Sequence, residues 1–318
     1  MRLPEHWTFF EEHLSWDYWY IIEDGVCHAF FLQYERDKDR AHMHSRQTIG
    51  HAVSRDFKAF EYLGTVLEAD KDTWNDLGVA TGSVVRHEQR YYMLYTGKGI
   101  SQHGVGLAVS DDLHHWQRYG DGPVLTTMLD ERCVDYHFEQ NGETQNVQLL
   151  ADPYVYPELI DGHYYCIINS WMKDLPKNDR GCQAMFKSKD LIHWEPHKIA
   201  LHTPGIDRTE TAQFWEKNGK WYLSFGGVVI KPDEGDFAAA SMATFIYMAD
   251  CFDGPYLPQT WSKLNIKVGG DYYLFKAMDI PGQGDALLVL NGNAEGNFGP
   301  YRLEYGADGE IKIGGLIR

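Results

Sequence analysis

A hairpin pattern that recurs four times constrains the fold of this chain more than any other feature of its sequence. The copies span residues 20–34, 84–97, 155–169 and 213–227. In three of them the turn carries Gly after Asp or Asn, as a tight hairpin turn prefers. The second strand is rich in aromatic residues in every copy. Short apolar and aromatic runs between such turns predict strands rather than helices.

A second element follows the first three hairpins: an apolar strand and then the pattern Ser-x-Asp-x-x-x-aromatic. Its copies span residues 51–60, 107–116 and 185–194. A short polar side chain can cap such a turn, while the aromatic residue packs back on the sheet. Trp116 and Trp194 of this element are therefore expected to serve packing.

A hairpin followed by one or two further strands, repeated about five times, predicts an all-β fold, the five-bladed β-propeller. Residues 244–256 form a degenerate copy of the second element, and residues 271–292 supply strands for a fifth unit. No linker interrupts the series, so residues 1–318 are predicted to form a single propeller domain. A β-sandwich is the main structural alternative.

Charge and hydropathy exclude several classes of function. The chain has 29 Lys and Arg against 46 Asp and Glu, a net charge of −17. Such a surface repels phosphate backbones and anionic lipid, which argues against nucleic-acid and membrane partners. No run approaches the roughly 18 apolar residues of a membrane span. The first residues carry acids and histidines where a signal peptide needs a basic start, so a cytoplasmic location is expected.

Cysteines and aromatic residues add two further expectations. The five cysteines are widely spread and form no CxxC pair, which fits buried free thiols in a reducing compartment. The 10 Trp, 20 Tyr and 15 Phe favour strands and also suit platforms for sugar rings. Trp16, Trp19 and Trp74 are candidates for stacking on a sugar.

Three acids precede their hairpins by a similar margin. Asp17, Asp152 and Glu210 open the first, third and fourth units. If first strands line a common funnel, these acids converge in one pocket. Glycosidic cleavage needs such a set, because one carboxylic acid protonates the leaving oxygen while a carboxylate attacks or activates water. A lone acid at a loop–strand junction is usually just solvated, and the shared position in three repeats favours catalysis.

Over residues 14–230 the chain resembles glycoside hydrolase family 32 and its relative, family 68. The resemblance rests on five segments in the family's order. The first is SWDYWY with the hairpin that ends in FLQY, and the second is TIGHAVSRDFKAF. The others are TGSVV with the following YTG, then ADPYVY, and last TETAQFW. It implies that Asp17 is the nucleophile, Asp152 the transition-state stabiliser and Glu210 the acid/base. It also implies that Gln33 contacts substrate and places Ser83 on the family's serine.

The chain departs from the family pattern at several positions. Ala151 stands where the family has an arginine that contacts sugar hydroxyls, so Arg208 or His42 is expected to replace that contact. Trp16-Asp17 resembles the family 68 opening, and Thr-Ala follows Glu210 in place of Cys-Pro. After about residue 270 the chain is expected only to close the fifth blade, without the family's C-terminal β-sandwich.

The resemblance implies a retaining, β-fructofuranosidase-like glycoside hydrolase that acts on a small carbohydrate. Retention requires carboxyls of Asp17 and Glu210 about 5–6 Å apart. The alternatives are an inverting arabinofuranosidase or xylosidase of the family 43 type, in which Asp17 is a general base, and a non-catalytic carbohydrate-binding propeller. Transglycosylation and the oligomeric state stay open. No cofactor is expected, and no metal either, because the His42-x-His44 and His114-His115 pairs lack zinc-site spacing.

Overall fold

The computed structural model describes residues 7–8, 10–100, 103–126, 132–133, 135–140, 143–148, 151–176, 178–229, 241–264, 272–291 and 296–317. In this part of the chain the regular structure is β, apart from the single 3-10 turn η1 (Arg40–His42). No helix within these ranges is long and apolar enough to cross a membrane. The predicted all-β class is confirmed.

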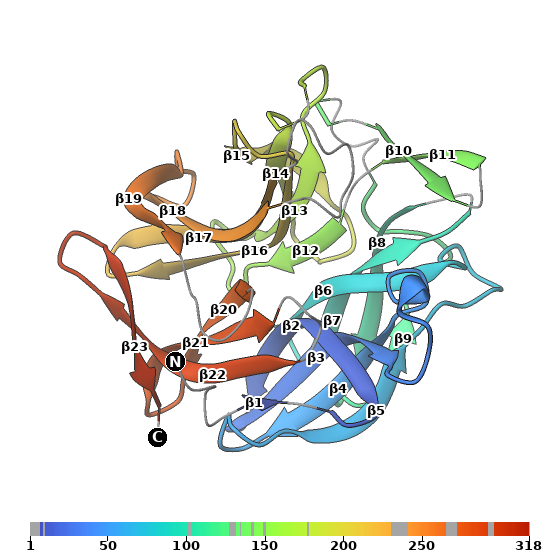
Figure 1. Cartoon of the computed structure of the whole chain (residues 1–318), viewed down its shortest axis with the longest axis horizontal. Coiled ribbons are helices and arrows are strands. Elements are labelled where there is room, and N and C mark those ends of the chain that lie inside the picture. Colours follow the sequence, from blue (N-terminus) through green and yellow to red (C-terminus); the bar gives the residue numbers. More distant parts are fainter. Residues whose placement is uncertain are drawn as a thin grey trace. The chain divides into compact units, whose positions relative to one another are not determined.

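Five antiparallel sheets follow one another along the chain, and in each sheet successive strands lie side by side (Figure 1). The first contains β2 (His13–Glu23), β3 (Val26–Glu35), β4 (Thr48–Ser54) and β5 (Glu61–Leu67). The second contains β6 (Gly78–His87), β7 (Arg90–Lys98), β8 (His103–Ser110) and β9 (Gln117–Arg118). The third contains β12 (Ala151–Val155), β13 (Tyr164–Trp171), β14 (Gly181–Ser188) and β15 (Glu195–His202).

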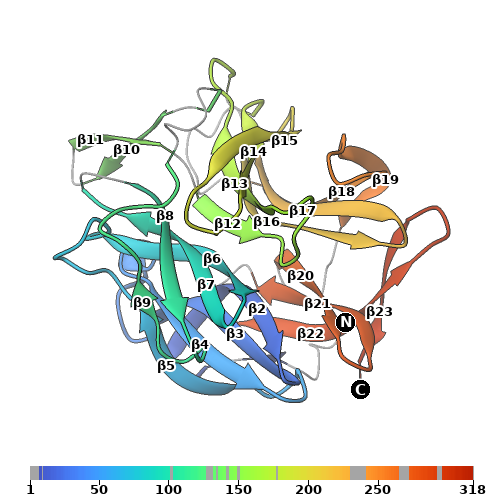
Figure 2. The same ribbon diagram turned by 180° about the vertical axis from the view of Figure 1, so that it is seen from behind.

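The last two sheets complete the series (Figure 2). The fourth contains β16 (Arg208–Lys217), β17 (Lys220–Val229), β18 (Ser241–Ala249) and β19 (Leu257–Leu264). The fifth contains β20 (Tyr272–Ile280), β21 (Gly284–Asn291), β22 (Asn297–Tyr305) and β23 (Ile311–Leu316). Strand β1 (Trp7–Thr8) pairs with β22, so the first and last parts of the chain share one sheet. A separate hairpin, β10 (Asp135–Gln140) with β11 (Glu143–Gln148), was not predicted.

The predicted hairpins form, and their turns show why. Each of the three two-residue turns with Gly has positive φ at both positions, as type I′ geometry requires. The three turns are Asp24-Gly25 (φ 49° and 73°), Asp161-Gly162 (49° and 73°) and Asn218-Gly219 (55° and 75°). Asp, Asn and Gly tolerate this left-handed backbone better than other residues. Local sequence chemistry therefore fixes the position of each hairpin.

The Ser-x-Asp element forms a capped turn in all three copies. In the second copy the Ser110 hydroxyl donates to Asp112 (3.1 Å), whose Oδ1 accepts the backbone N–H groups of His114 and His115 (both 2.8 Å). The other two copies repeat this pattern around Asp56 and Asp190. The Trp116 and Trp194 rings turn back so that each indole N–H donates to a backbone carbonyl within its own turn. The predicted packing role is confirmed for Trp194, which is buried in the core of unit 2, and stays a prediction for Trp116.

The chain divides into two compact units, which are described separately. Unit 1 comprises Met1–Val66, Gln213–Gly226 and Ala243–Arg318, and unit 2 comprises Leu67–Ala212 and Gly227–Met242. Strand β16 passes from unit 2 into unit 1 after Ala212. The predicted single domain stays a prediction.

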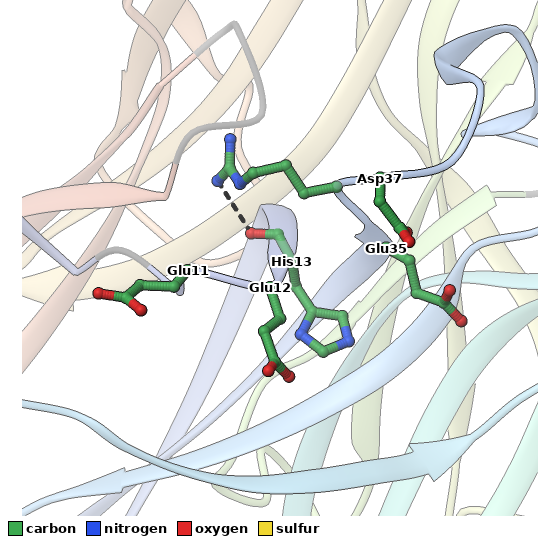
Figure 3. A pocket seen from close by; sticks show the side chains of 6 residues that line it. Glu11, Glu12, His13, Glu35 and Asp37 are labelled. Atoms are coloured by element: carbon green, nitrogen blue, oxygen red, sulfur yellow. Dashed lines mark hydrogen bonds between the residues drawn. The ribbon is translucent and has the colours of Figure 1, made fainter.

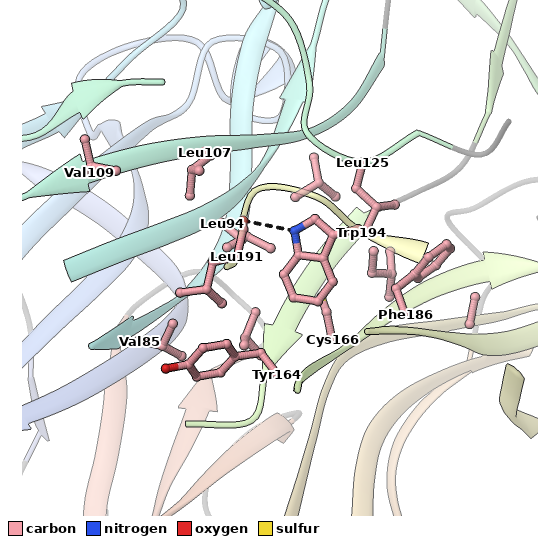
Figure 4. Packing of buried hydrophobic residues seen from close by; sticks show 14 of the residues in the cluster. Val85, Leu94, Leu107, Val109, Leu125, Tyr164, Cys166, Phe186, Leu191 and Trp194 are labelled. Atoms are coloured by element: carbon pink, nitrogen blue, oxygen red, sulfur yellow. Dashed lines mark hydrogen bonds between the residues drawn. The ribbon is translucent and has the colours of Figure 1, made fainter. Parts of the chain in front are cut away.

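Each unit has its own apolar core. In unit 2, side chains from the second and third sheets interlock, with Trp194 and Phe186 packed against the same cluster as Leu94 (Figure 4). In unit 1, Phe31 and Tyr18 of the first sheet pack with Leu290 of the fifth. Full burial of one such side chain contributes about 1.5–3 kcal/mol. These cores hold the first strand of each sheet in place.

The cysteines are free thiols. Cys27, Cys133, Cys166 and Cys182 are buried, as predicted, and burial raises the pKa of the Cys27 thiol. Cys251 is exposed, which differs from the prediction, because it lies in the tight turn after β18.

Candidate active site

Asp17 lies in unit 1, on the first strand of the first sheet. The pairing of β2 with β3 shifts register between Trp16 and Trp19, and Asp17 has a φ of 49°. A residue with a side chain rarely adopts this conformation within a strand. Such a bulge re-aims a side chain and is over-represented next to active sites. Asp17 is half-buried at this bulge.

Asp152 lies in unit 2, on the first strand of the third sheet, and repeats this geometry. The register of β12 against β13 shifts between Ala151 and Tyr154, and Asp152 has a φ of 53°. Its backbone N–H donates to Thr96 Oγ1 of the second sheet (2.9 Å). Two of the three predicted acids thus occupy matching strand irregularities.

Glu210 lies next to Asp152 in unit 2. The residue that follows it, Thr211, has a φ of 41°, and its backbone N–H donates to Asp152 Oδ2 (3.0 Å). This bond joins the first strands of the third and fourth sheets at the two acids. The structure therefore brings Asp152 and Glu210 together. Asp17 belongs to the other unit, so its predicted distance to them stays a prediction.

Arg208 is paired with Glu210 on the same strand. Its Nε lies 2.6 Å from Glu210 Oε1, and both side chains are less than one-fifth exposed. Burial raises the pKa of Glu210, the Arg208 charge opposes this shift, and the charge of Asp152 adds to it. The net direction is upward, because burial and a nearby carboxylate disfavour the ionised form. Glu210 is thus suited to hold a proton at higher pH than an ordinary glutamate.

The other predicted binding residues of unit 2 have structural contacts. A Cβ on Gly97 would collide with the Trp74 ring, so this half-buried indole lies directly against the Gly97 backbone. Ser83 is buried and its hydroxyl accepts the Val155 N–H (3.1 Å). Ser83 thus ties β12 to the second sheet. Their predicted contacts with substrate stay predictions.

The predicted binding residues of unit 1 are mostly buried. Trp19 is only 3% exposed and stacks on Phe30. Trp16 is 8% exposed and meets the His44 ring edge-on. Such burial leaves the Trp19 ring little surface for a sugar in this conformation.

Gln33 and His42, also in unit 1, differ in exposure. Gln33 is buried and donates to the hydroxyls of Thr48 (3.1 Å) and Thr65 (2.8 Å). His42 is exposed in η1. The expected contacts of both residues with substrate stay predictions.

Sequence reasoning missed a cluster beside Arg208. The Arg180 guanidinium lies 3.3 Å from the centroid of the Trp171 ring, and its Nε contacts Asp207 Oδ1 (3.0 Å). This cation–π and ion-pair arrangement fixes the residue that precedes Arg208 on the chain. The only sequence signal was the adjacent pair Asp207-Arg208.

A hollow of about 580 Å³ in unit 1 has none of the predicted site residues in its lining. It is lined by Glu11, Glu12, His13, Glu35, Arg36 and Asp37 (Figure 3). The Arg36 side chain donates to the His13 carbonyl (3.1 Å), which holds the strand end in place. Within the described residues, no group of three His, Cys, Asp or Glu side chains is arranged to hold a metal ion.

Comparison with known proteins identifies the family. The glycosyl hydrolases family 32 N-terminal domain matches residues 19–277. The chain belongs to glycosyl hydrolase family 32. The resemblance seen in the motifs is thereby confirmed.

Individual relatives extend this result. The bifunctional 6(G)-fructosyltransferase/2,1-fructan:2,1-fructan 1-fructosyltransferase of Allium cepa is 37% identical over 105 residues, which cover 30% of this chain and 16% of that protein. The family 32 β-fructofuranosidase of Bombyx mori has a TM-score of 0.72 at 18% identity, over 98% of this chain and 65% of the silkworm chain. Bacillus subtilis levansucrase has a TM-score of 0.69 at 13% identity, over 97% and 88%.

The structural likeness confirms the predicted fold class, a five-bladed β-propeller in which the five sheets are the blades. The chain spans less than two-thirds of the length of the silkworm enzyme and about one-sixth of the onion enzyme.

Proposed function

We propose that this family 32 protein is a retaining glycoside hydrolase that cleaves a β-fructofuranoside. The observation that carries the proposal is the pairing of Asp152 with Glu210 through the Thr211 N–H (3.0 Å). Two carboxyl groups of unlike environment are the components of a glycosidase site. The pKa of Glu210 is raised by burial and by Asp152, which suits it to the role of proton donor.

The proposed reaction has two steps. Glu210 donates its proton to the glycosidic oxygen as the bond from that oxygen to the anomeric carbon breaks, and the Asp17 carboxylate bonds to this carbon. Ionised Glu210 then takes a proton from water, whose oxygen displaces Asp17 and releases the free sugar. Asp152 accepts hydrogen bonds from ring hydroxyls that tighten in the transition state. If a sugar hydroxyl replaces water, the product is a longer fructan, which is the type of reaction named for the onion relative.

Arg208 gives the proposal a further element. Its guanidinium is within 3 Å of Glu210, so it stabilises the carboxylate that must form when the proton leaves. Ala151 offers no side-chain contact at the position of the family's arginine, and Arg208 is the cation beside the acids in the described part of unit 2. We propose that it also takes over contact with the glycone.

A substrate panel with stereochemical analysis tests the function. Sucrose, short fructans, and nitrophenyl arabinofuranosides and xylosides are each incubated with the wild type and with Glu210→Gln. We expect turnover of a fructoside, loss of that turnover in the variant, and a first product with retained configuration by NMR. Initial inversion, or turnover of the arabinoside alone, would move the protein to the family 43 type of mechanism. Sugar binding without turnover of any substrate would support a binding propeller.

A further inference from the structure

The second sheet supplies the support for Asp152. Strand β6 shifts register against β7 between Ala80 and Gly82, which places Thr81 at an irregularity. The Thr96 hydroxyl of β7 donates to the Thr81 carbonyl (3.1 Å) and accepts the Asp152 N–H (2.9 Å). Thr96 is 1% exposed. The buried Thr96 hydroxyl thus forms hydrogen bonds with the irregular segments of both β6 and β12.

The bonds continue from Asp152 to the acid/base. With a φ of 53°, Asp152 directs its N–H to Thr96 and its carboxylate to the fourth sheet, where Oδ2 accepts the Thr211 N–H. Thr211 directly follows Glu210. These hydrogen bonds, from Thr81 to Thr211, therefore link the first strands of three sheets through residues of unit 2, and they end beside the proposed proton donor.

We propose that Thr96 is a positioning residue whose hydroxyl holds the Asp152 backbone in the left-handed conformation that aims its carboxylate at β16. The proposal rests on the proposed function, since it assigns Thr96 a role in that reaction. Thr96 does not touch the reacting atoms; it acts through Asp152.

The chemistry of this position calls for a hydroxyl. The group must accept from Asp152 and donate to Thr81 at the same time, which a hydroxyl does and a methyl group does not. The two γ-substituents of threonine also restrict its χ1 rotation, which keeps the oxygen in place. An unpaired buried N–H is costly, so without the hydroxyl we expect the Asp152 backbone to relax towards ordinary strand geometry.

A purely structural role is the competing explanation, and a matched variant separates the two. Thr203 is also a buried threonine of unit 2, and its hydroxyl donates to the Gly181 carbonyl (2.9 Å). Its hydrogen bonds are with Gly181 and Ile206, not with Asp152 or Glu210. Thr203→Val therefore removes one buried hydroxyl that bonds to a backbone carbonyl and to neither acid.

The test compares Thr96→Val, Thr96→Ser and Thr203→Val by kinetics on sucrose and by ¹³C NMR titration of Glu210, assigned with Glu210→Gln. For Thr96→Val we expect kcat to fall between about tenfold and a hundredfold, as for a misplaced catalytic group, with a smaller change in KM. The pKa of Glu210 should fall, because the Asp152 charge that raises it moves away while Arg208 stays. Thr96→Ser should restore both values, and Thr203→Val should leave both unchanged.

Equal kcat and equal Glu210 pKa in the two valine variants would overturn the proposal. If Thr96→Val does not fold, Thr96→Cys provides a graded variant, because a thiol is a weak donor and acceptor; an unchanged Glu210 pKa in it would also count against the proposal. If the wild type cleaves no sugar, the proposed function fails, and the Glu210 titration still decides the role of Thr96.

Discussion

Acids occur in two recurring settings in this molecule, in the Ser-x-Asp turns and on the first strands of the sheets. Asp112 represents the turns: its carboxylate accepts from Ser110, His114 and His115, all within three residues. Asp152 represents the first strands: its carboxylate accepts a hydrogen bond from Thr211, 59 residues away and on another sheet. The turn acid is satisfied by its own segment, whereas the strand acid depends on the tertiary fold.

The pKa values of the acids in the two settings are shifted in opposite directions. The side chain of His115 and nearby backbone N–H groups lower the pKa of Asp112, so this group stays ionised. Burial raises the pKa of Glu210, and the Asp152 charge raises it further against the opposing Arg208. A carboxylate stabilised by local donors serves structure, because it has little tendency to take up a proton. A buried carboxyl beside a second acid can exchange a proton with substrate.

The largest effect is expected from Asp17→Asn, which removes the proposed nucleophile. The amide is nearly isosteric, so we expect the fold and sugar binding to persist while nearly all turnover is lost. Steady-state kinetics and sugar binding by calorimetry measure the two properties. Rates equal to the wild type, in a preparation free of contaminating enzyme, would exclude Asp17 as the nucleophile.

Replacement of one acid from each setting tests the comparison directly. Glu210→Gln removes the proton donor and should lower kcat on sucrose by about 10²–10⁴-fold, the usual contribution of general acid–base catalysis. The loss should be smaller for a substrate with an acidic leaving group, which needs less protonation. Asp190→Asn, in the third Ser-x-Asp turn, should leave kcat unchanged. Similar losses in both variants would remove the distinction between site acids and turn acids.

The sequence predicts those parts of the fold that local chemistry determines. Asp or Asn before Gly fixes three hairpin turns, and Ser-x-Asp fixes the capped turns, since their partners lie within three residues. The hairpin β10–β11 was missed, although Asn141-Gly142 stands between its strands as a hairpin signal. It was missed because the prediction followed the recurring hairpins and Ser-x-Asp turns, and this hairpin is not one of their copies.

For the candidate site, the sequence predicts which residues take part but not their backbone conformation or their contacts. The shared position before the hairpins identifies Asp152 and Glu210, but no pattern in the sequence indicates the positive φ of Asp152 or its bond from Thr96. The contact of Arg180 with Trp171 was likewise missed, because cross-strand and inter-sheet partners depend on register and packing. The buried state of Trp19 has the same cause: its stacking on Phe30 follows from the β2–β3 register.

Arg208→Ala tests, through the pH dependence of the reaction, how the charge of Arg208 affects the pKa of Glu210. Arg208 opposes the upward shift of the Glu210 pKa, so its removal should raise that pKa further. The reaction needs protonated Glu210 and is lost as pH rises through this pKa, so the alkaline limb of kcat/KM should move to higher pH. Arg208→Lys keeps the charge and should shift the limb less. A limb that moves to lower pH in Arg208→Ala would show that Arg208 does not stabilise the carboxylate.

The smallest effect is expected from Asp112→Ala, and it concerns stability. Loss of the turn acceptor should lower the free energy of unfolding by about 1 kcal/mol at pH 7, without a change in kcat. The folded-state pKa of Asp112 lies below that of the unfolded chain. Its ionised form therefore stabilises the fold above about pH 4, and this contribution is lost as pH falls through the folded-state pKa.

Urea unfolding of the wild type and Asp112→Ala should accordingly show a stability difference that is full at pH 7 and shrinks below about pH 4. Asp121→Ala, at an exposed aspartate beyond β9, controls for removal of a surface charge. A difference that stays constant from pH 7 to pH 3 would mean that the Asp112 carboxylate is not held ionised by its turn. The turn acids would then no longer differ from the site acids in the way their hydrogen bonds indicate.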